Sequence, residues 1–234
     1  WSSSLNVALY NSAAALLEEL FGLPLSRAGA LGHLRWFSQR FDPVVERLLE
    51  LLQTAPVVHA DETGWRIDGK NVWCWCFGNP QIAVFLIDHH RSREVFEKAL
   101  GAGLPGVLVS DSYAAYNQIA ARKQRCLAHL LRELKKLREE LSPRLVAKNI
   151  QPLLELFQDA IRLRGQRAEL GPRAFAARKQ AIQHRLDERW WRTSSDPDCR
   201  RIYQRLRRHK DELLVFLDEP GVPPDNNAAQ RDNR

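Results

Sequence analysis

Two short apolar runs, each ending in an aspartate, place the strongest constraint on the fold of this 234-residue chain. One runs from Val57 to Asp61 and the other from Val107 to Asp111. Such runs, bounded by turn residues, are typical of buried strands, and a carboxylate at their end is costly to bury without a cationic partner. We therefore expect Asp61 and Asp111 to meet on neighbouring strands and hold a divalent metal. Aspartates that simply cap turns are the alternative.

The bulk composition is that of a soluble globular protein. Hydrophobic residues make up 44% and charged residues 27% of the chain, which are ordinary values. No apolar stretch approaches the roughly 20 residues that span a bilayer. Four irregularly spaced cysteines indicate a reducing cytoplasm rather than a disulfide scaffold. The chain begins at Trp1 and lacks methionine, so we interpret it as a fragment of a longer protein.

Positive charge is concentrated in one part of the chain. Residues 121–210 contain 24 Lys and Arg against 10 Asp and Glu, a balance of +14, whereas the whole chain carries +7. The remaining residues are therefore acidic overall. A basic segment beside an acidic one suits a protein that grips a polyanion with one part and binds metal with another. The alternative is that helices in this segment have solvated basic faces.

Apolar periodicity predicts a mixed α/β fold. Strands are expected at 57–61, resuming at 65–67, and at 71–77, 82–87 and 107–111, with a two-residue hairpin at Asp68-Gly69. Helices are expected at 8–22, 25–53, 92–100, 127–141, 150–170, 172–191 and 197–217, with Ser26 and Asp196 as N-caps. The two N-terminal helices suit either a helix-turn-helix or an ordinary helical hairpin. The strand that ends at Asp111 should lie beside the strand that ends at Asp61.

Four motifs resemble, in the same order, the transposases of bacterial insertion sequence 66. They are His59-Ala60-Asp61-Glu62-Thr63, Ser110-Asp111-Ser112-Tyr113-Ala114-Ala115-Tyr116, Arg125-Cys126-Leu127-Ala128-His129-Leu130-Leu131-Arg132 and Asp225-Asn226-Asn227-Ala228-Ala229-Gln230-Arg231. The resemblance implies a ribonuclease-H-like core with Asp-Asp-Glu metal chemistry on DNA. It further implies a helical N-terminal region over 1–55, a core over 56–141, a basic, all-helical insertion over 142–218 and a final catalytic helix that begins in 219–234. Asp61 and Asp111 match the two family aspartates.

The third catalytic position departs from the family pattern. Where the family motif has Glu, this chain has Gln230, 119 residues after Asp111. An amide brings no negative charge to a metal and cannot act as a base. Three explanations for the glutamine compete: a deliberate inactivating change, decay of a mobile-element copy, or replacement of the glutamate's role by a neighbouring acidic residue. Asp232 would point the wrong way on a helix. We expect an impaired site formed by Asp61, Asp111 and Gln230, with Mg²⁺ or Mn²⁺ as the metal.

Several other residues are candidates for DNA contact. Basic side chains in the third motif and in the basic segment suit phosphate contacts, and these candidates are Arg125, His129, Arg132, Arg200, Arg201, Arg205 and Arg208. The resemblance places the Cys126–His129 pair near the active site, and a zinc site is disfavoured because too few ligands accompany it. Trp190 and Trp191 suit core anchors better than base-stacking platforms.

Asp88-His89-His90 raises a rival interpretation. It resembles the signature tripeptide of Mn²⁺-dependent phosphoesterases, but a lone tripeptide is weak support. No second Asp/His cluster accompanies it, so we favour a strand end that enters a basic loop of His90, Arg91 and Arg93 in contact with the DNA backbone.

The interpretation that best joins these features is a transposase fragment for metal-dependent DNA strand cleavage and strand transfer. A catalytically inactive DNA-binding protein derived from a transposase is the alternative, and Gln230 favours it. The resemblance implies transposon ends and target DNA as partners, a homodimer on DNA, no membrane association and a bacterial, nucleoid-associated cytoplasmic location.

Overall fold

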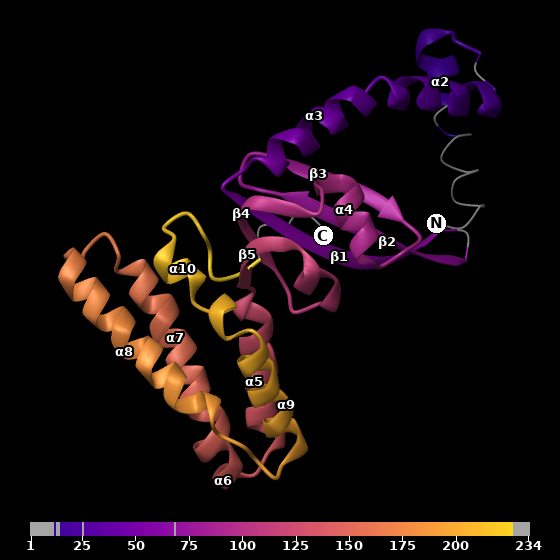
Figure 1. Cartoon of the computed structure of the whole chain (residues 1–234). Coiled ribbons are helices and arrows are strands. Elements are labelled where there is room, and N and C mark those ends of the chain that lie inside the picture. Colours follow the sequence, from indigo (N-terminus) through magenta and orange to yellow (C-terminus); the bar gives the residue numbers. More distant parts are fainter. Residues whose placement is uncertain (1–11, 13–14, 25, 68, 227–234) are drawn as a thin grey trace.

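A computed structural model describes residue 12 and residues 15–24, 26–67 and 69–226. Figure 1 shows a central sheet with a helical arm on one side and a helical bundle on the other. Gln230 and the expected terminal helix fall outside the described residues. In chain order the elements are α2 (Arg27–Gln39), α3 (Asp42–Gln53), β1 (Val57–Ile67), β2 (Lys70–Gly78), β3 (Ala83–Asp88), α4 (Arg93–Leu100), β4 (Gly103–Ser110), η1 (Ala114–Gln118), β5 (Ala120–Arg125), α5 (Leu127–Glu140), α6 (Pro143–Leu145), η2 (Val146–Ile150), α7 (Gln151–Gly165), α8 (Pro172–Trp190), α9 (Pro197–Arg208), η3 (Lys210–Glu212) and α10 (Val215–Asp218).

The sheet confirms the predicted mixed α/β class. Its five strands lie in the order β3-β2-β1-β4-β5. The β1–β2 and β2–β3 pairs are antiparallel, whereas β4 pairs in parallel with both β1 and β5. The strand that precedes Asp111 therefore lies beside the strand that carries Asp61, as expected. This arrangement is compatible with a ribonuclease-H-like core accompanied by helices.

Strand β1 is longer and more regular than the sequence predicts. The expected break at Gly64 is absent, because Gly64 pairs with Trp73 inside a continuous antiparallel ladder with β2. The hairpin itself is confirmed, since the ladder runs to the Ile67–Lys70 pair. Gly69 in the turn has a φ of +77°, a conformation that favours glycine. The antiparallel pairing thus carries β1 past Asp61, which lies within the strand rather than at its end.

Strand β5 was not predicted. Its sequence, Ala-Ala-Arg-Lys-Gln-Arg, lacks the apolar alternation that indicates a strand. It forms because β4 offers a parallel partner, and its last three residues are buried although all are polar. Gln124 is satisfied there by hydrogen bonds with the Leu213 carbonyl and the Phe216 amide. Tertiary hydrogen bonds therefore replace the apolar burial that sequence patterns detect.

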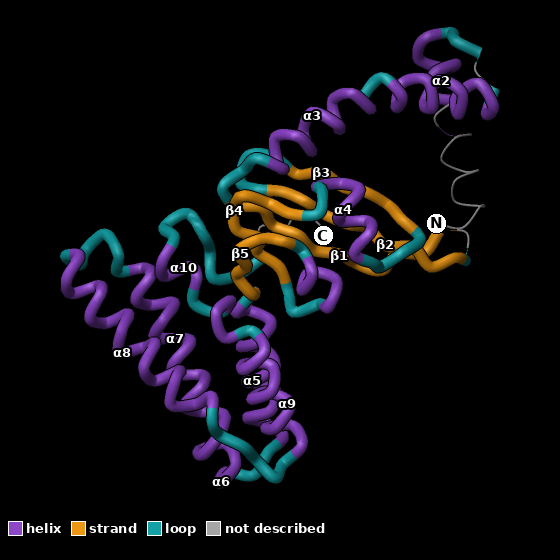
Figure 2. Tube along the Cα trace, in the orientation of Figure 1, coloured by secondary structure: helices purple, strands orange, loops and turns teal. Residues whose placement is uncertain are grey.

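Each face of the sheet buries its own apolar core. Val58 and Leu108 lie in the core that α3 and α4 cover, with Trp75 and Phe96. Val107 and Val109 alternate to the opposite core, where α5 and the following helices pack. Figure 2 shows α5 and the following helices to one side of the sheet, whereas α3 meets the sheet at one end and leads to α2, which lies farther away. By the alternation of β1, Asp61 shares a face with Val57, which packs against the bundle-side core.

Two expected helices are interrupted. The helix expected over 25–53 breaks at Arg40–Phe41, because Pro43, in the first turn of α3, lacks the amide hydrogen that a continuous helix would need. The helix expected over 197–217 ends at Arg208, and η3 and α10 follow. This turn lets Glu212 reach the end of β5.

The predicted helix starts are confirmed. Ser26 Oγ accepts from Gly29 N at 3.0 Å, and Asp196 Oδ1 accepts from Cys199 N at 2.9 Å. In the described part of the chain, each helix falls short of the length or the apolar character needed to cross a bilayer.

Candidate active site

The register of the sheet brings the two aspartate positions together. In the parallel ladder Val57 pairs with Val107 and His59 with Val109, an offset of 50 residues. Asp61 and Asp111 are separated by the same 50 residues, although the ladder itself ends at the His59–Val109 pair and Asp111 follows the last residue of β4. Neighbouring strands lie about 4.8 Å apart, and residues paired across them point to the same face. The register therefore places Asp61 and the Asp111 loop next to the same part of the sheet.

The loop that carries Asp111 is held by short local contacts. Asp111 Oδ1 accepts a hydrogen bond from the Tyr113 amide at 2.8 Å, which closes an Asx turn. The backbone carbonyl of Asp111 accepts from Arg125 Nη1 at 2.7 Å. These contacts fix the loop from both sides, and the Asp111 side chain remains half-buried at the sheet edge.

Arg125, the last residue of β5, is a buried support of this loop rather than an exposed DNA contact. It is 1% exposed, and its guanidinium also donates to Asn117 Oδ1 at 2.7 Å and to Glu212 Oε2 at 2.6 Å. Burial raises the pKa of Glu212, but the hydrogen bond from His209 and the charge of Arg125 outweigh it and lower the pKa to about 2. Burial argues against the expected DNA contact of Arg125, because its donors already serve protein acceptors.

Glu62, next to Asp61, is a residue whose role sequence patterns did not reveal. Its side chain is 1% exposed. Oε1 accepts from Arg91 Nε at 3.0 Å and Nη2 at 2.7 Å, and Oε2 accepts from the Tyr116 hydroxyl. Burial raises the pKa of Glu62, and the hydrogen bonds from Tyr116 and Arg91 oppose this effect. In the sequence, only its position next to Asp61 drew attention to Glu62. The alternation of β1 turns the Glu62 side chain to the face opposite that of Asp61.

The last described residue, Asn226, is anchored on β1 beside Asp61. Its Nδ2 donates to the Ala60 carbonyl at 2.8 Å, and its Oδ1 lies 2.7 Å from His59 Nδ1. An amide oxygen only accepts, so His59 Nδ1 carries the proton. The backbone N–H of Asn226 also donates to Cys126 Sγ at 3.2 Å. The fourth motif is therefore docked against the first and third motifs at its start, and the expected third position lies four residues beyond.

A cleft of about 370 Å³ opens beside Asp111, between its loop and the helical bundle. Its lining includes Arg91, Asp111, Tyr113, His129, Glu133 and Arg205. Arg205 Nη1 contacts Glu133 Oε2 within the cleft. Burial lowers the pKa of His129, whereas the nearby charge of Asp111 raises it. The cleft thus brings basic groups from three separate elements to Asp111.

The remaining DNA candidates lie on the outer surface. Arg132 on α5 and Arg200, Arg201 and Arg208 on α9 are exposed. Arg201 is engaged with Glu133 at 3.2 Å and with Asp198 at 3.0 Å. The opposite side of α9 buries Ile202, Tyr203 and Leu206 in the bundle, so α9 presents its arginines outward from a rigid base.

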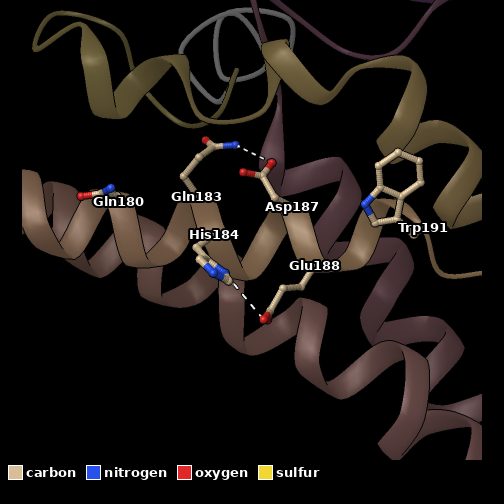
Figure 3. A pocket seen from close by; sticks show the side chains of 6 residues that line it. All are labelled: Gln180, Gln183, His184, Asp187, Glu188 and Trp191. Atoms are coloured by element: carbon tan, nitrogen blue, oxygen red, sulfur yellow. Dashed lines mark hydrogen bonds and ion pairs between the residues drawn. The ribbon is translucent and has the colours of Figure 1, made fainter.

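A larger hollow of about 550 Å³ on α8 lies outside this arrangement (Figure 3). Its polar side chains pair with one another, Gln183 with Asp187 at 3.1 Å and His184 with Glu188 at 3.6 Å. Trp191 at its end is 85% exposed, so the expectation that it anchors the core was wrong. The carboxylates in this hollow make it a poor site for a phosphate.

The donors present near Asp61 and Asp111 fit a hard cation. Mg²⁺ prefers one or two carboxylates together with water and phosphate oxygens. Within residues 15–24, 26–67 and 69–226 no set of three or more His, Cys, Asp or Glu side chains is arranged as a metal site. The four cysteines are all free thiols.

Comparison with known proteins gives two matches. The family model described as Transposase IS66 family matches residues 6–234. The chain is also similar to the uncharacterized protein y4jD of Sinorhizobium fredii, at 25% identity over 244 residues. That alignment covers 90% of this chain and 47% of the relative, so the chain spans about half the length of the curated relative it matches.

Proposed function

This chain belongs to the transposase IS66 family, and we propose that it provides metal-dependent DNA strand cleavage and strand transfer of an insertion sequence. The observation that supports the proposal is the parallel β1–β4 ladder, whose register of 50 residues equals the separation of Asp61, in β1, from Asp111, in the loop after β4. Two neighbouring carboxylates on one face are what a phosphoryl-transfer metal site requires.

Asp61 and Asp111 would hold the cation, Mg²⁺ or Mn²⁺. Once bound there, the metal would supply charge stabilisation and activation of an attacking oxygen at a DNA phosphodiester. The chain's own residues position these carboxylates. The Tyr113 amide and Arg125 hold the Asp111 loop, and the β1–β2 ladder holds Asp61.

Gln230 occupies the third ligand position in this proposal. In support of this, Asn226, the last described residue, contacts the backbone at Ala60, and position 230 follows it by four residues in the sequence. A neutral amide there weakens the hold on a divalent cation, because a carbonyl oxygen ligates without charge. We therefore propose that the site is impaired.

DNA contacts are assigned to basic residues of the third motif and the basic segment. His129 and Arg205 line the Asp111 cleft, whereas Arg132, Arg200, Arg201 and Arg208 are exposed. Exposed arginines suit contacts with the phosphate backbone, which position DNA without reading sequence. The partners are then transposon ends and target DNA, handled by a homodimer in the bacterial cytoplasm.

A second candidate function is DNA binding without catalysis. The neutral Gln230 favours it, since the basic segment needs no metal to hold DNA. The two candidates differ only in whether the aspartates still support strand cleavage.

Nicking of supercoiled plasmid at constant Mg²⁺ separates these candidates. We expect Gln230→Glu to raise the rate of cleavage by at least an order of magnitude, because it restores the missing ligand charge. Loss of a single partner of a metal site changes metal affinity or activity roughly 10- to 100-fold. Asp61→Asn in the Gln230→Glu background, an isosteric change, should abolish the gain.

Plasmid binding without metal-dependent cleavage in both forms would establish the non-catalytic alternative. Equal cleavage by the unaltered chain and Gln230→Glu would show that position 230 is not the third ligand.

A further inference from the structure

We propose that Arg91 binds a phosphate of the DNA strand that enters the cleft beside Asp111. Arg91 lies in the loop between β3 and α4 and lines this cleft. The inference rests on the proposed function, that the chain acts on DNA, and it assigns one phosphate subsite within that function.

The guanidinium of Arg91 is oriented by three side chains. Its Nε and Nη2 atoms both donate to Glu62 Oε1, at 3.0 and 2.7 Å. Its Cζ atom lies 4.6 Å from the ring centroid of Trp73 and 4.0 Å from that of Tyr113. Stacking and a carboxylate partner together restrict a side chain that is otherwise rich in rotamers. Arg91 is therefore pre-organised before any ligand arrives.

The support beneath Arg91 is itself rigid. Glu62 is nearly inaccessible, and its second oxygen accepts from the Tyr116 hydroxyl. Tyr116 is fully buried and packs edge-on against Trp75 and Phe96. The Tyr113 hydroxyl donates to the Arg91 carbonyl, which fixes the backbone of the loop as well. A surface arginine needs no such scaffold merely to be solvated.

The chemistry of the cleft favours a phosphate as the ligand of Arg91. Arginine has five N–H donors, more than the contacts with Glu62 use, and its side chain is 36% exposed toward the cleft side of the loop. Planar guanidinium donors match phosphate oxygens closely. Arg205 stands in the same cleft, so a strand passing Asp111 meets basic groups from the sheet side and the bundle side.

The salt dependence of DNA binding tests this contact. Binding of a short duplex of arbitrary sequence is followed by fluorescence anisotropy at several KCl concentrations, with Ca²⁺ held constant. The slope of log K against log[salt] is negative, and loss of one phosphate contact reduces its magnitude by about 0.9. We expect Arg91→Ala to show this change with a roughly tenfold loss of affinity. Arg66→Ala, an exposed arginine of β1 outside the cleft, is the control and keeps the original slope.

Two further variants separate phosphate binding from a bracing role. Arg91→Lys keeps the charge but loses the paired donors to Glu62, so it should keep the slope while affinity falls severalfold. Arg91→Gln keeps one donor for Glu62 but loses the charge, so the magnitude of its salt slope should fall as in Arg91→Ala. This variant replaces Arg91→Ala in the test if the alanine variant does not fold.

The outcomes distinguish this inference from the proposed function. DNA binding with an unchanged slope in Arg91→Ala or Arg91→Gln would overturn the phosphate contact and leave the proposed function standing. Failure of the unaltered chain to bind duplex DNA would overturn both.

Discussion

The end of β5 and the outer face of α9 use arginine in opposite ways. Arg125 is 1% exposed and bonded to the Asp111 carbonyl, Asn117 and Glu212. Arg208 is exposed at the end of α9, whose buried side packs in the bundle. The same residue type thus secures the geometry of the candidate site in one region and presents charge to solvent in the other.

Burial decides which of these roles an arginine has. A buried guanidinium must have all its donors satisfied, so it fixes the groups that surround it. An exposed guanidinium contributes little to stability but adds to the electrostatic attraction for a polyanion. Mutations in the first region should therefore change folding stability, and mutations in the second should change DNA binding.

The largest expected effect is on stability. Arg125→Met should lower the free energy of unfolding by about 3 kcal/mol, because Glu212 and the Asp111 carbonyl lose a charged partner in a buried setting. Urea denaturation followed by far-UV circular dichroism measures it. Arg208→Met, the matched change on the exposed face, should stay within about 0.5 kcal/mol. Equal losses in the two variants would break the comparison.

The acid sensitivity of the buried region is the next effect. The pKa of Glu212 is lowered to about 2 in the folded chain from the ordinary 4.5. A lowered folded-state pKa contributes stability that is fully present above pH 4.5 and is lost as the pH falls toward 2. Glu212→Gln should therefore give a flatter stability curve between pH 4.5 and 2 than the unaltered chain.

Urea midpoints across that range measure the difference in curvature. Glu155→Gln, an exposed carboxylate on α7, is the matched control. Parallel curves for the unaltered chain and Glu212→Gln would show that the pair with Arg125 does not stabilise the fold.

The smallest effect is on DNA affinity. Arg208→Ala should reduce the magnitude of the negative slope of log K against log[salt] by about 0.9, because one phosphate contact is lost. The free energy of unfolding should stay unchanged within about 0.5 kcal/mol. Anisotropy titrations of a duplex at several salt concentrations measure this slope. An unchanged slope would show that Arg208 does not contact DNA. The proposed phosphate contacts near the active site would then be those of the cleft beside Asp111.

Much of the fold was predictable because local patterns were strong. The hairpin at Asp68-Gly69, the N-caps at Ser26 and Asp196, and the pairing of the two aspartate strands follow from short-range signals that the structure confirms. Strand β5 was missed because its residues are basic and its stability comes from pairing with β4. The turn after Arg208 was missed because local patterns do not record the ion pair between Glu212 and Arg125, residues far apart in the sequence, that holds this segment against β5.

The candidate site shows the same division. Asp61 and Asp111 stand out because a carboxylate that interrupts an apolar run is rare enough to signal a purpose. The structural roles of Glu62 and Asn226 have no such pattern, since their partners Arg91, Tyr116 and Ala60 are distant in sequence or on the backbone.

The sequence by itself determined the two aspartates, the mixed sheet and the concentration of positive charge, because each depends on neighbouring residues or on simple counts. Only the tertiary structure decided which basic residues face solvent. Arg125 and Arg208 are the same residue type, but their exposure differs. It depends on whether neighbouring elements remove the guanidinium from water and supply acceptors for it. That is a property of packing over long distances in sequence, which no local pattern records.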